Sequence, residues 1–494
     1  MALTSFSFLC FFLFTAMVYY ILPQRFQWMI LLTASLTFYY ISGGWAVLPF
    51  LLYGIFISYL GGLLLERTKE GSRKKTLFTW MFVVLTLLPL FLLKYVRFFG
   101  FPAPFGPLAP LGISFYTMSI LGYVIDVSWG ILPAQKNIFR HALFTSYFPQ
   151  MISGPITRYS QMAEQLFSPH AFSYQQVTFG AQRILWGFFK KLVISERLAL
   201  AVNLVYDQYP VYQGWYLVVA TICFAFQLYT DFSGCMDIVL GVSQVFGISL
   251  PENFACPYFS RSISEYWRRW HITLGIWFKE YLFYPLQKSP LWIAFLDWSK
   301  KRLGKKRGKK LPLYTGMLVL WFSVGMWHGG SWNFIVGSGL LHWFYIVAGE
   351  LLTPLWKRLT ALFQVRTQVF SWHFFQGLRT FLLVNIGFVF FRAPSLKVAL
   401  SMLFSMGRVQ NPQILFDRSL FQLMTPQDWM IALASLLLLL FVSSLQQKIR
   451  IRETLAAQNL VFRWSLYLLL FVAVLIFGCY GGDYDAAAFI YQRF

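Results

Sequence analysis

The sequence is poor in charged residues, and acidic residues are scarcer than basic ones. Charged residues make up 12% of the 494 positions, with 18 acidic against 41 basic side chains, whereas 58% of the positions are hydrophobic. A chain of this length and composition has more apolar surface than one soluble core can bury. This excludes an ordinary soluble protein. It predicts an all-α polytopic membrane protein, because a chain that crosses lipid must satisfy its backbone hydrogen bonds internally.

Cysteine is also scarce, and its spacing argues against two kinds of site. The five cysteines form no C-x-x-C pair and lie mostly in apolar surroundings. We interpret them as core thiols and expect neither a disulfide framework nor a cysteine-bound metal. The N-terminus has no basic stretch before its apolar run and no clear small-residue cleavage site, which predicts a retained first span.

The positive charges gather in short loops between apolar runs. Three examples are residues 66–75, 300–310 and 448–452. Such loops are typical of the cytoplasmic side of a membrane protein and favour contact with anionic lipid in the bilayer. The net charge of +23 by itself suggests nucleic acid, but this distribution makes a nucleic-acid partner a poor alternative.

About twelve apolar segments qualify as membrane spans, although the second is short. They are residues 5–22, 28–41, 45–65, 77–99, 111–129, 177–204, 215–229, 313–327, 332–352, 375–391, 429–445 and 464–480. If the basic loop at 66–75 is cytoplasmic, an even number of spans places both termini outside. We expect one integral-membrane domain over residues 1–494. Its parts are N-terminal spans at 1–130, a core at 141–392, and C-terminal spans with a tail at 429–494.

Residues 148–159 (FPQMISGPITRY) do not fit a simple span. The segment is apolar, but Pro149, Gly154 and Pro155 interrupt any helix. Non-helical backbone at membrane depth is tolerated only where protein or water satisfies it. The segment is therefore either re-entrant and cavity-lining or a loop at the membrane interface.

Residues 262–286 (SISEYWRRWHITLGIWFKEYLFYPL) carry too many charges for a lipid-facing span. We predict one helix, capped by Ser262 or Ser264, in which Glu265 pairs with Arg269 one turn later. The aromatic residues suit an interfacial or buried amphipathic helix.

Pro285 is expected to end this helix. The charged face of the helix allows two interpretations. In one, Arg268, Arg269 and His271 face a polar funnel that admits an anionic donor. In the other, the arginines reach lipid phosphates and His271 only packs.

Asp231 and Asp237 lie in an otherwise apolar run, residues 227–237. Unpaired carboxylates are costly there, so they need cationic partners. We expect Arg268 or Arg269 to be those partners, and we favour a structural over a catalytic role for the acids.

The stretch at 323–342 (SVGMWHGGSWNFIVGSGLLH) places His328 between two strongly apolar segments. Gly329 and Gly330 interrupt regular structure there, and Ser331 can cap the helix that follows. An ionisable residue at membrane depth is often functional. On this stretch alone, a packed core histidine is an equally good interpretation.

Two long motifs resemble the core of the membrane-bound O-acyltransferase family. They are residues 229–282, which begin YTDFSGCMD and include SEYWRRWHITLGIW, and MWHGGSWNF at 326–334. Supporting matches are PLGISFY at 110–116, the segment at 148–159, and NIGFVFFRAP at 385–394. The resemblance is to the bacterial branch that includes the alginate O-acetyltransferase membrane subunit. The chain departs from that branch at Cys235-Met236 and at 286–288. These departures put the identity of the partner and of the acceptor in doubt more than the chemistry.

The resemblance implies a multi-helix fold with re-entrant or interfacial helices and a transmembrane tunnel. It implies that His328 is the principal catalytic histidine and His271 the second motif histidine. His342 matches a third histidine of this branch, to which we assign a structural or acceptor-side role. The substrate-binding candidates are Arg268, Arg269, Trp327, Asn333 and Asp231.

Histidine suits the chemistry that the family performs. A hydroxyl that attacks an activated acyl group needs a base with a pKa near neutrality, and histidine has about 6.5. We therefore predict His328 as general base, and His271 as a group that orients or polarises the donor carbonyl. Metal binding is disfavoured, because the histidines lack close ligand spacing and no carboxylate accompanies His328. We expect no bound cofactor.

The last six residues, FIYQRF at 489–494, carry a separate hypothesis. They resemble the C-terminal motif of the small partner protein of the related teichoic-acid D-alanylation system, whose tyrosine is implicated as an acyl carrier. A phenol, with a pKa of about 10, is easier to deprotonate than an aliphatic hydroxyl and is a better leaving group. We predict Tyr491 as a catalytic acyl relay; the alternative is a terminal aromatic anchor in the membrane interface.

The sequence therefore predicts an O-acyltransferase of the bacterial cytoplasmic membrane. It would move an acetyl group from acetyl-CoA or another acyl thioester to a cell-envelope or secreted polysaccharide, together with an extracytoplasmic esterase-like partner. Transfer of D-alanine to teichoic acid from a carrier protein is an alternative within this chemistry. A transporter, or a scaffold of an export complex, is the alternative outside it.

Overall fold

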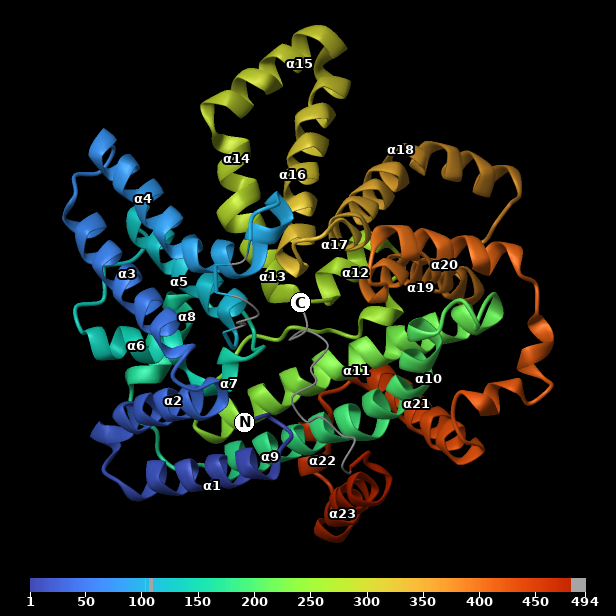
Figure 1. Ribbon diagram of the computed structural model, residues 1–494, viewed down its shortest axis with the longest axis horizontal. Coiled ribbons are helices and arrows are strands. Elements are labelled where there is room, and N and C mark those ends of the chain that lie inside the picture. The colour runs from blue at the N-terminus through green and yellow to red at the C-terminus, as the bar shows by residue number, and fades with distance from the viewer. Residues whose placement is uncertain (103, 106–109, 481–494) are drawn as a thin grey trace. The chain divides into compact units, whose positions relative to one another are not determined.

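The computed structural model describes residues 1–102, 104–105 and 110–480 (Figure 1). Every regular element in this part of the chain is a helix, and its one isolated β-bridge joins Phe254 to Trp270. The all-α prediction is confirmed. The described chain forms two compact units, and each is described by itself. The prediction of a single domain stays a prediction.

The first unit is built from three separate stretches of chain: residues 1–196, residues 228–252, and the described residues from 449 on. It includes the part of α11 (Trp215–Val245) that follows residue 227. Its other elements are α1 (Phe6–Ile21), η1 (Gln24–Phe26), α2 (Gln27–Gly43), α3 (Leu48–Arg67), α4 (Arg73–Leu90), η2 (Phe91–Tyr95), η3 (Val96–Phe99), α5 (Ile113–Ser128), α6 (Ile138–Ser146), α7 (Phe148–Met151), α8 (Tyr159–Phe167), α9 (Tyr174–Phe188), η4 (Phe189–Ser195), α22 (Ile451–Ala456) and α23 (Leu460–Phe477).

Glycines bring α9 and α11 close together in the first unit. A Cβ atom on Gly180 would lie 2.6 Å from the carbonyl oxygen of Gly241, and one on Gly187 would lie 2.5 Å from that of Gly234. No larger side chain fits without separating the two backbones. The π-helical segment η4, which directly follows α9, is thereby held against α11.

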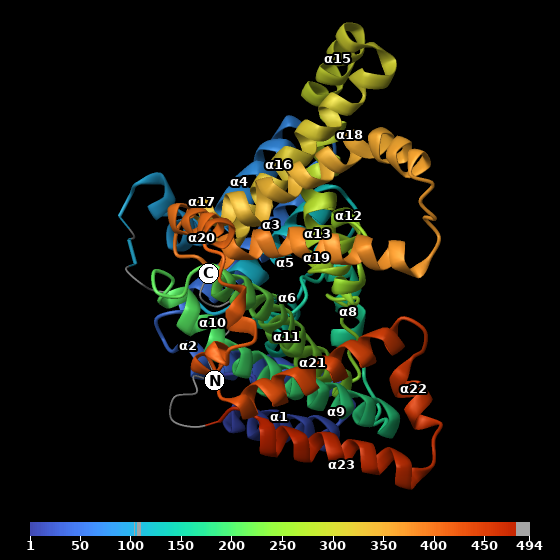
Figure 2. The ribbon, with the colours of Figure 1, turned by 90° about the vertical axis from the view of Figure 1, so that its right-hand side faces the viewer.

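The last helix of the first unit, α23, packs along α9 and η4 (Figure 2). Just after α23, the backbone N–H of Cys479 donates a hydrogen bond to the carbonyl of Leu192, at 3.0 Å. This contact anchors the described end of the chain to η4.

The second unit comprises residues 197–227 and 253–448. It includes the first part of α11 and nearly all of α10 (Glu196–Asp207). Its other elements are η5 (Pro257–Phe259), α12 (Ile263–Arg269), α13 (Ile272–Phe278), η6 (Lys279–Phe283), α14 (Tyr284–Lys288), α15 (Pro290–Gly308), α16 (Lys310–His328), α17 (Trp332–Phe334), η7 (Ile335–Leu340), α18 (Leu341–Leu362), α19 (Phe370–Arg392), α20 (Leu396–Arg408), η8 (Pro412–Leu415), η9 (Ser419–Gln422) and α21 (Pro426–Gln446).

Within this unit α14 leads into α15, and α16 returns beside them (Figure 1). The basic run at 300–310 occupies the end of α15 and the start of α16, and most of it is exposed. Gly304, at φ 76°, kinks α15 within this run. The predicted basic loop is therefore largely helical, and it lies where the chain turns from α15 into α16.

Seven helices among the described residues are long and apolar enough to cross a membrane. They are Leu48–Arg67, Arg73–Phe99, Trp215–Val245, Trp332–Leu362, Phe370–Arg392, Pro426–Gln446 and Leu460–Phe477. Two shorter apolar helices, α1 and α5, coincide with further predicted spans. The chain is a polytopic helical membrane protein, whereas the count of twelve spans and the tunnel stay predictions.

The structure corrects one predicted helix and clarifies another segment. Residues 262–286 are not one helix: α12 ends at Arg269, α13 begins at Ile272, and Pro285 lies at the start of α14 instead of ending a helix. Residues 148–157 are buried, with one short helix followed by irregular backbone, which agrees with a segment enclosed by protein. The cysteines are all free, and Cys10 is exposed instead of in a core.

Candidate active site

The break between α12 and α13 places His271 at the N-terminus of α13. Its backbone is left-handed, with φ 48° and ψ 51°, a conformation that costs a residue other than glycine about 1–2 kcal/mol. Two backbone hydrogen bonds hold it there: Ala255 N–H to the Arg269 carbonyl at 2.9 Å, and Ile272 N–H to the Asn253 carbonyl at 3.0 Å. A short antiparallel pairing with residues 253–255 therefore overrides the helical preference of the sequence.

The side chain of Asn253 completes this pairing. Its Oδ1 atom accepts hydrogen bonds from the Thr273 backbone N–H at 3.1 Å and from the Thr273 hydroxyl at 3.0 Å. The same oxygen lies 3.3 Å from Nδ1 of His271. Asn253 and His271 are both about 1% exposed, so the whole arrangement is shielded from solvent.

His328 is the last residue of α16, where a turn at Gly329 and Gly330 separates it from α17. The backbone approaches closely there, because a Cβ atom on Gly325 would lie 2.7 Å from Cα of Ile335 in η7. His328 is 3% exposed. The prediction of a histidine at a helix end, followed by a break, is confirmed.

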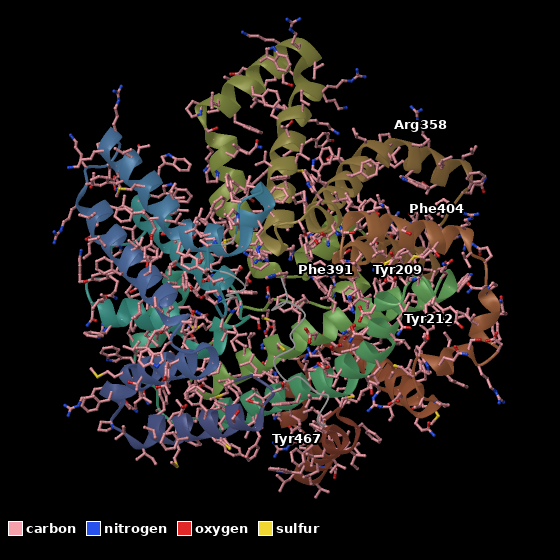
Figure 3. All side chains as sticks on the ribbon, in the orientation of Figure 1. Tyr209, Tyr212, Arg358, Phe391, Phe404 and Tyr467 are labelled. Atoms are coloured by element: carbon pink, nitrogen blue, oxygen red, sulfur yellow. The ribbon has the colours of Figure 1, made fainter. Side chains whose placement is uncertain are left out.

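The structure brings the two predicted catalytic histidines together in the second unit. Their ring centres are 6.5 Å apart, too far for a direct hydrogen bond but close enough for one substrate group to reach both rings. Trp327 lies against both, at 5.6 Å from His271 and 5.2 Å from His328. On the other side Phe391, labelled in Figure 3, lies 5.6 Å from His328 and 5.2 Å from Phe334. The site is a buried histidine pair with aromatic walls.

Burial decides the charge of His271. It lowers the pKa of the imidazole to about 3, because an imidazolium is poorly solvated there. The ring is therefore neutral near pH 7, and its unprotonated nitrogen can accept a hydrogen bond. Within the described residues, no group of three or more His, Cys, Asp or Glu side chains could hold a metal ion.

The amide of Asn333 serves the fold of the turn after His328. Its Nδ2 donates to the carbonyl oxygens of Phe390 at 3.3 Å and Ala393 at 3.0 Å, and its Oδ1 accepts from the hydroxyl of Ser331 at 2.6 Å. This side chain therefore ties α17 to the end of α19. Its predicted contact with substrate stays a prediction.

Arg268 and Arg269 end α12 in the same unit. Arg268 is exposed, and Arg269 forms the predicted ion pair with Glu265, at 2.7 Å. That pair is confirmed. A role of the two arginines in binding an anionic donor is untested.

Asp231 and Asp237 belong to the first unit, where η4 and α9 supply their partners. Lys191 lies 2.5 Å from Asp231, and Lys190 and Arg183 lie 2.5 Å and 2.9 Å from Asp237. The prediction that Arg268 or Arg269 would pair with these acids is therefore wrong. The favoured structural role of the acids agrees with this network, whereas a contact of Asp231 with substrate stays a prediction.

His342 lies on α18 among aromatic side chains. Its ring is 4.8 Å from Trp267, 5.8 Å from Trp321 and 6.1 Å from Tyr345, and it is 3% exposed. This environment agrees with the structural role that the sequence suggested. Tyr491, the predicted relay, lies outside the described residues.

Two features of the structure were missed by sequence reasoning. Asn253 carried no signal of its own, because it is one polar residue in a loop and its partner is distant in sequence. Lys190 and Lys191 did carry a signal, since two adjacent lysines inside the apolar run FFKKLVI require nearby acids.

The comparisons with known proteins agree with this site. Residues 132–294 match the model of the membrane-bound O-acyltransferase family. A protein of Pseudomonas aeruginosa named as a probable alginate O-acetylase is 32% identical over 80% of this chain and 73% of its own length. A peptidoglycan O-acetyltransferase of Helicobacter pylori is 31% identical over 76% of this chain and 72% of its own. A teichoic acid D-alanyltransferase of Bacillus subtilis is 29% identical over 53% and 65%.

An identity above 30% across most of both chains is too extensive to come from shared hydrophobicity alone. The match to the family model, residues 132–294, includes His271. The alternatives of a transporter or a scaffold are therefore not supported. The chain belongs to the membrane-bound O-acyltransferase family and is an acyltransferase of the membrane.

Proposed function

We propose that the protein acetylates hydroxyl groups of a cell-envelope or secreted polysaccharide at the bacterial cytoplasmic membrane. The observation that carries the proposal is the buried pair of His271 and His328, 6.5 Å apart, in a site walled by aromatic side chains. Relatives that act on alginate and peptidoglycan support acetyl as the group and a polysaccharide as acceptor. An extracytoplasmic esterase-like partner would complete delivery.

The proposed reaction is transfer from a cytoplasmic thioester such as acetyl-CoA. The oxygen of an acceptor hydroxyl attacks the acyl carbon, a C–O bond forms and the C–S bond breaks. His328 takes the proton of the hydroxyl and returns it to the departing sulfur, so the products are an ester and a thiol. A base of this kind contributes about 10²–10⁴-fold to the rate.

Tyr491 is proposed as an intermediate acceptor. Its phenol would receive the acyl group first and then pass it to the polysaccharide, because a phenyl ester keeps enough transfer potential for a second step. Mass spectrometry of the C-terminal peptide, from protein that is turning over donor, should find an acyl group on Tyr491. Full activity of Tyr491→Phe would exclude the relay.

Transfer of D-alanine to teichoic acid is the second candidate. It is favoured by the relative of Bacillus subtilis and by the F-x-Y-x-x-F ending of this chain. Its donor would be an aminoacylated carrier protein. Membranes supplied with acetyl-CoA alone would then show no transfer.

The deciding experiment supplies radiolabelled acetyl-CoA to membranes and follows the label in protein and polysaccharide. Wild type should label both, and His328→Ala should label neither at a normal protein level. His373→Ala, on the first two turns of α19, is the matched histidine control and should behave as wild type. Undiminished transfer by His328→Ala would overturn the assignment of the base.

A further inference from the structure

The hydrogen bonds around Asn253 determine which of its side-chain atoms faces His271. A backbone N–H can only donate, so the Asn253 atom 3.1 Å from the Thr273 nitrogen is the amide oxygen and not the amide nitrogen. The same atom is the one 3.3 Å from Nδ1 of His271. An oxygen of this kind can only accept, so Nδ1 must carry the proton that is shared with it.

We propose that Asn253 is a positioning residue that keeps the proton of His271 on Nδ1, so that Nε2 is the bare nitrogen presented to substrate. Nδ1 and Nε2 lie on different edges of the ring. With Nδ1 turned to Asn253, Nε2 is on the edge turned away from it. Nε2 is therefore the ring nitrogen that can accept a hydrogen bond from a reacting group.

The backbone geometry gives this hydrogen bond its precision. The left-handed residue His271 is fixed between Arg269 and Ile272, which both bond to the segment at 253–255. The backbone that carries Asn253 is thus the same backbone that holds the His271 main chain. Two main-chain hydrogen bonds therefore fix the His271 ring and the Asn253 amide relative to each other. A side chain on a loop without these bonds would be held less precisely.

The proposal assigns His271 a role different from the one expected of it. A neutral ring with its only proton on Nδ1 has none left on Nε2 to donate to a thioester carbonyl. His271 instead accepts a hydrogen bond at Nε2, for example from the attacking hydroxyl, whose proton goes to His328. If it becomes charged, Asn253 Oδ1 still accepts from Nδ1 and stabilises the imidazolium.

Several ionisable side chains lie on the elements next to His271. His328 on α16 is the titratable group whose ring lies 6.5 Å away. The other ionisable groups on α12, α13 and η6 are Glu265, Tyr266, Arg268, Arg269, Lys279, Glu280 and Tyr281. Desolvation is the cause of the low pKa of His271. A carboxylate introduced at position 253 would add a negative charge beside Nδ1 of the ring.

The first test is spectroscopic and needs no substrate. Nitrogen-15 NMR of the full-length, histidine-labelled protein at pH 7 distinguishes a bare from a protonated ring nitrogen. His271→Gln identifies the signal among the six histidines. We expect bare Nε2 and protonated Nδ1 in wild type, and a mixture of the two tautomers in Asn253→Ala. A wild-type ring protonated on Nε2, or an unchanged spectrum in Asn253→Ala, would overturn the proposal.

The second test measures acetyl transfer against pH and rests on the proposed function. Asn253→Ala should lose about tenfold in rate, less than the 10²–10⁴-fold expected when the general base itself is lost. Asn253→Asp keeps the acceptor oxygen but adds a charge, which should restore most of the rate and raise the pKa of His271 by about 1–3 units. The acid limb of its pH profile should move upward by that amount.

A matched control makes the same exchange elsewhere in the second unit. Asn411 accepts a hydrogen bond from the Trp215 N–H through its Oδ1, at 2.9 Å, so Asn411→Asp also keeps its acceptor. Its acid limb should stay in place. An unmoved limb in Asn253→Asp, or an equal shift in both variants, would overturn the positioning role. If neither the wild type nor any variant transfers acetyl, the proposal of an acetyl donor is wrong. The NMR result would still decide which tautomer His271 adopts.

Discussion

Two clusters of buried polar groups, one in each unit, follow opposite designs. In the first unit Lys190, Lys191, Asp231 and Asp237 are all charged, and each is paired through atoms at 2.5–2.9 Å from an opposite charge. In the second unit the predicted catalytic residue His271 is an uncharged ring beside Trp327, and His328 lies next to Phe391. The first design fixes a structure, whereas the second leaves nitrogen atoms available for chemistry.

The physical reason is the cost of a charge in a low-dielectric interior. A buried ion is tolerated when a partner and hydrogen bonds replace its hydration, and it is then committed to that partner. A neutral imidazole needs no such partner. Its ring nitrogens therefore stay available to interact with a bound substrate. A paired charge cluster is thus expected to control stability, and the histidine pair to control rate.

The largest expected effect separates rate from stability at His328. His328→Gln should lower acyl transfer by about 10²–10⁴-fold, because the base is lost. The thermal midpoint of the purified protein should stay within a few degrees of wild type, since glutamine is a polar side chain similar in size to histidine. A large drop in the midpoint would show that His328 is a structural residue and would remove the contrast between the units.

The opposite result is expected at Lys191. Its side chain is 1% exposed and contacts both Asp231 and Glu196. Lys191→Met removes the cation beside the buried carboxylate of Asp231 and should cost about 3–5 kcal/mol in unfolding free energy. The yield of folded protein and its thermal midpoint in detergent would report this loss.

A second substitution checks that charge is the cause. Lys191→Met combined with Asp231→Leu removes the buried pair together, and hydrophobic replacement of a whole pair is often close to neutral. The double variant should recover part of the lost stability. If it is less stable than Lys191→Met alone, packing and not charge explains the first result.

A smaller effect is expected from the glycines that bring the ion pairs together. Gly187→Ala places a methyl group 2.5 Å from the Gly234 carbonyl oxygen, which forces α9 and α11 apart. We expect a loss of about 1–3 kcal/mol, measured as thermal midpoint. Gly377→Ala on α19 meets nothing within 4 Å and is the control, with no loss and a gain of up to about 1 kcal/mol. Equal behaviour of the two variants would contradict the close approach.

Much of the fold followed from hydrophobic runs. Helix bounds near Leu48–Arg67, Phe370–Arg392 and Pro426–Gln446 agree with predicted spans, because a long apolar run in lipid has few alternatives to a helix. The same local logic failed at 262–286. There the helical pattern continues through Trp270, but pairing with residues 253–255 breaks it, and no periodicity reveals a tertiary hydrogen bond.

The site shows the same division. His271 and His328 were found from their motifs, since an ionisable residue in an apolar setting is visible in the sequence. The partners of Asp231 and Asp237 were not, because many cations are available and only the folded chain brings one beside each acid. Asn253 was invisible for a related reason: its importance comes from a neighbour 18 positions later.

The smallest effect concerns pH and tests whether the histidine site is neutral in the folded state. The pKa of His271 is lowered to about 3, below its value of about 6.5 in the unfolded chain. The unfolded chain therefore binds a proton first as the pH falls, so stability is complete above pH 6.5 and declines toward pH 3. At pH 5.5 the loss should be about 1.4 kcal/mol, and His271→Gln should remove it.

In the first unit, burial also lowers the pKa of His141 to about 3, so His141→Gln should reduce the pH dependence in the same way. Thermal midpoints measured from pH 7.5 to 5.5 would show it. A pH slope that neither variant reduces would mean that both imidazoles are already charged in the folded protein, and the contrast between a charged and a neutral interior would then fail.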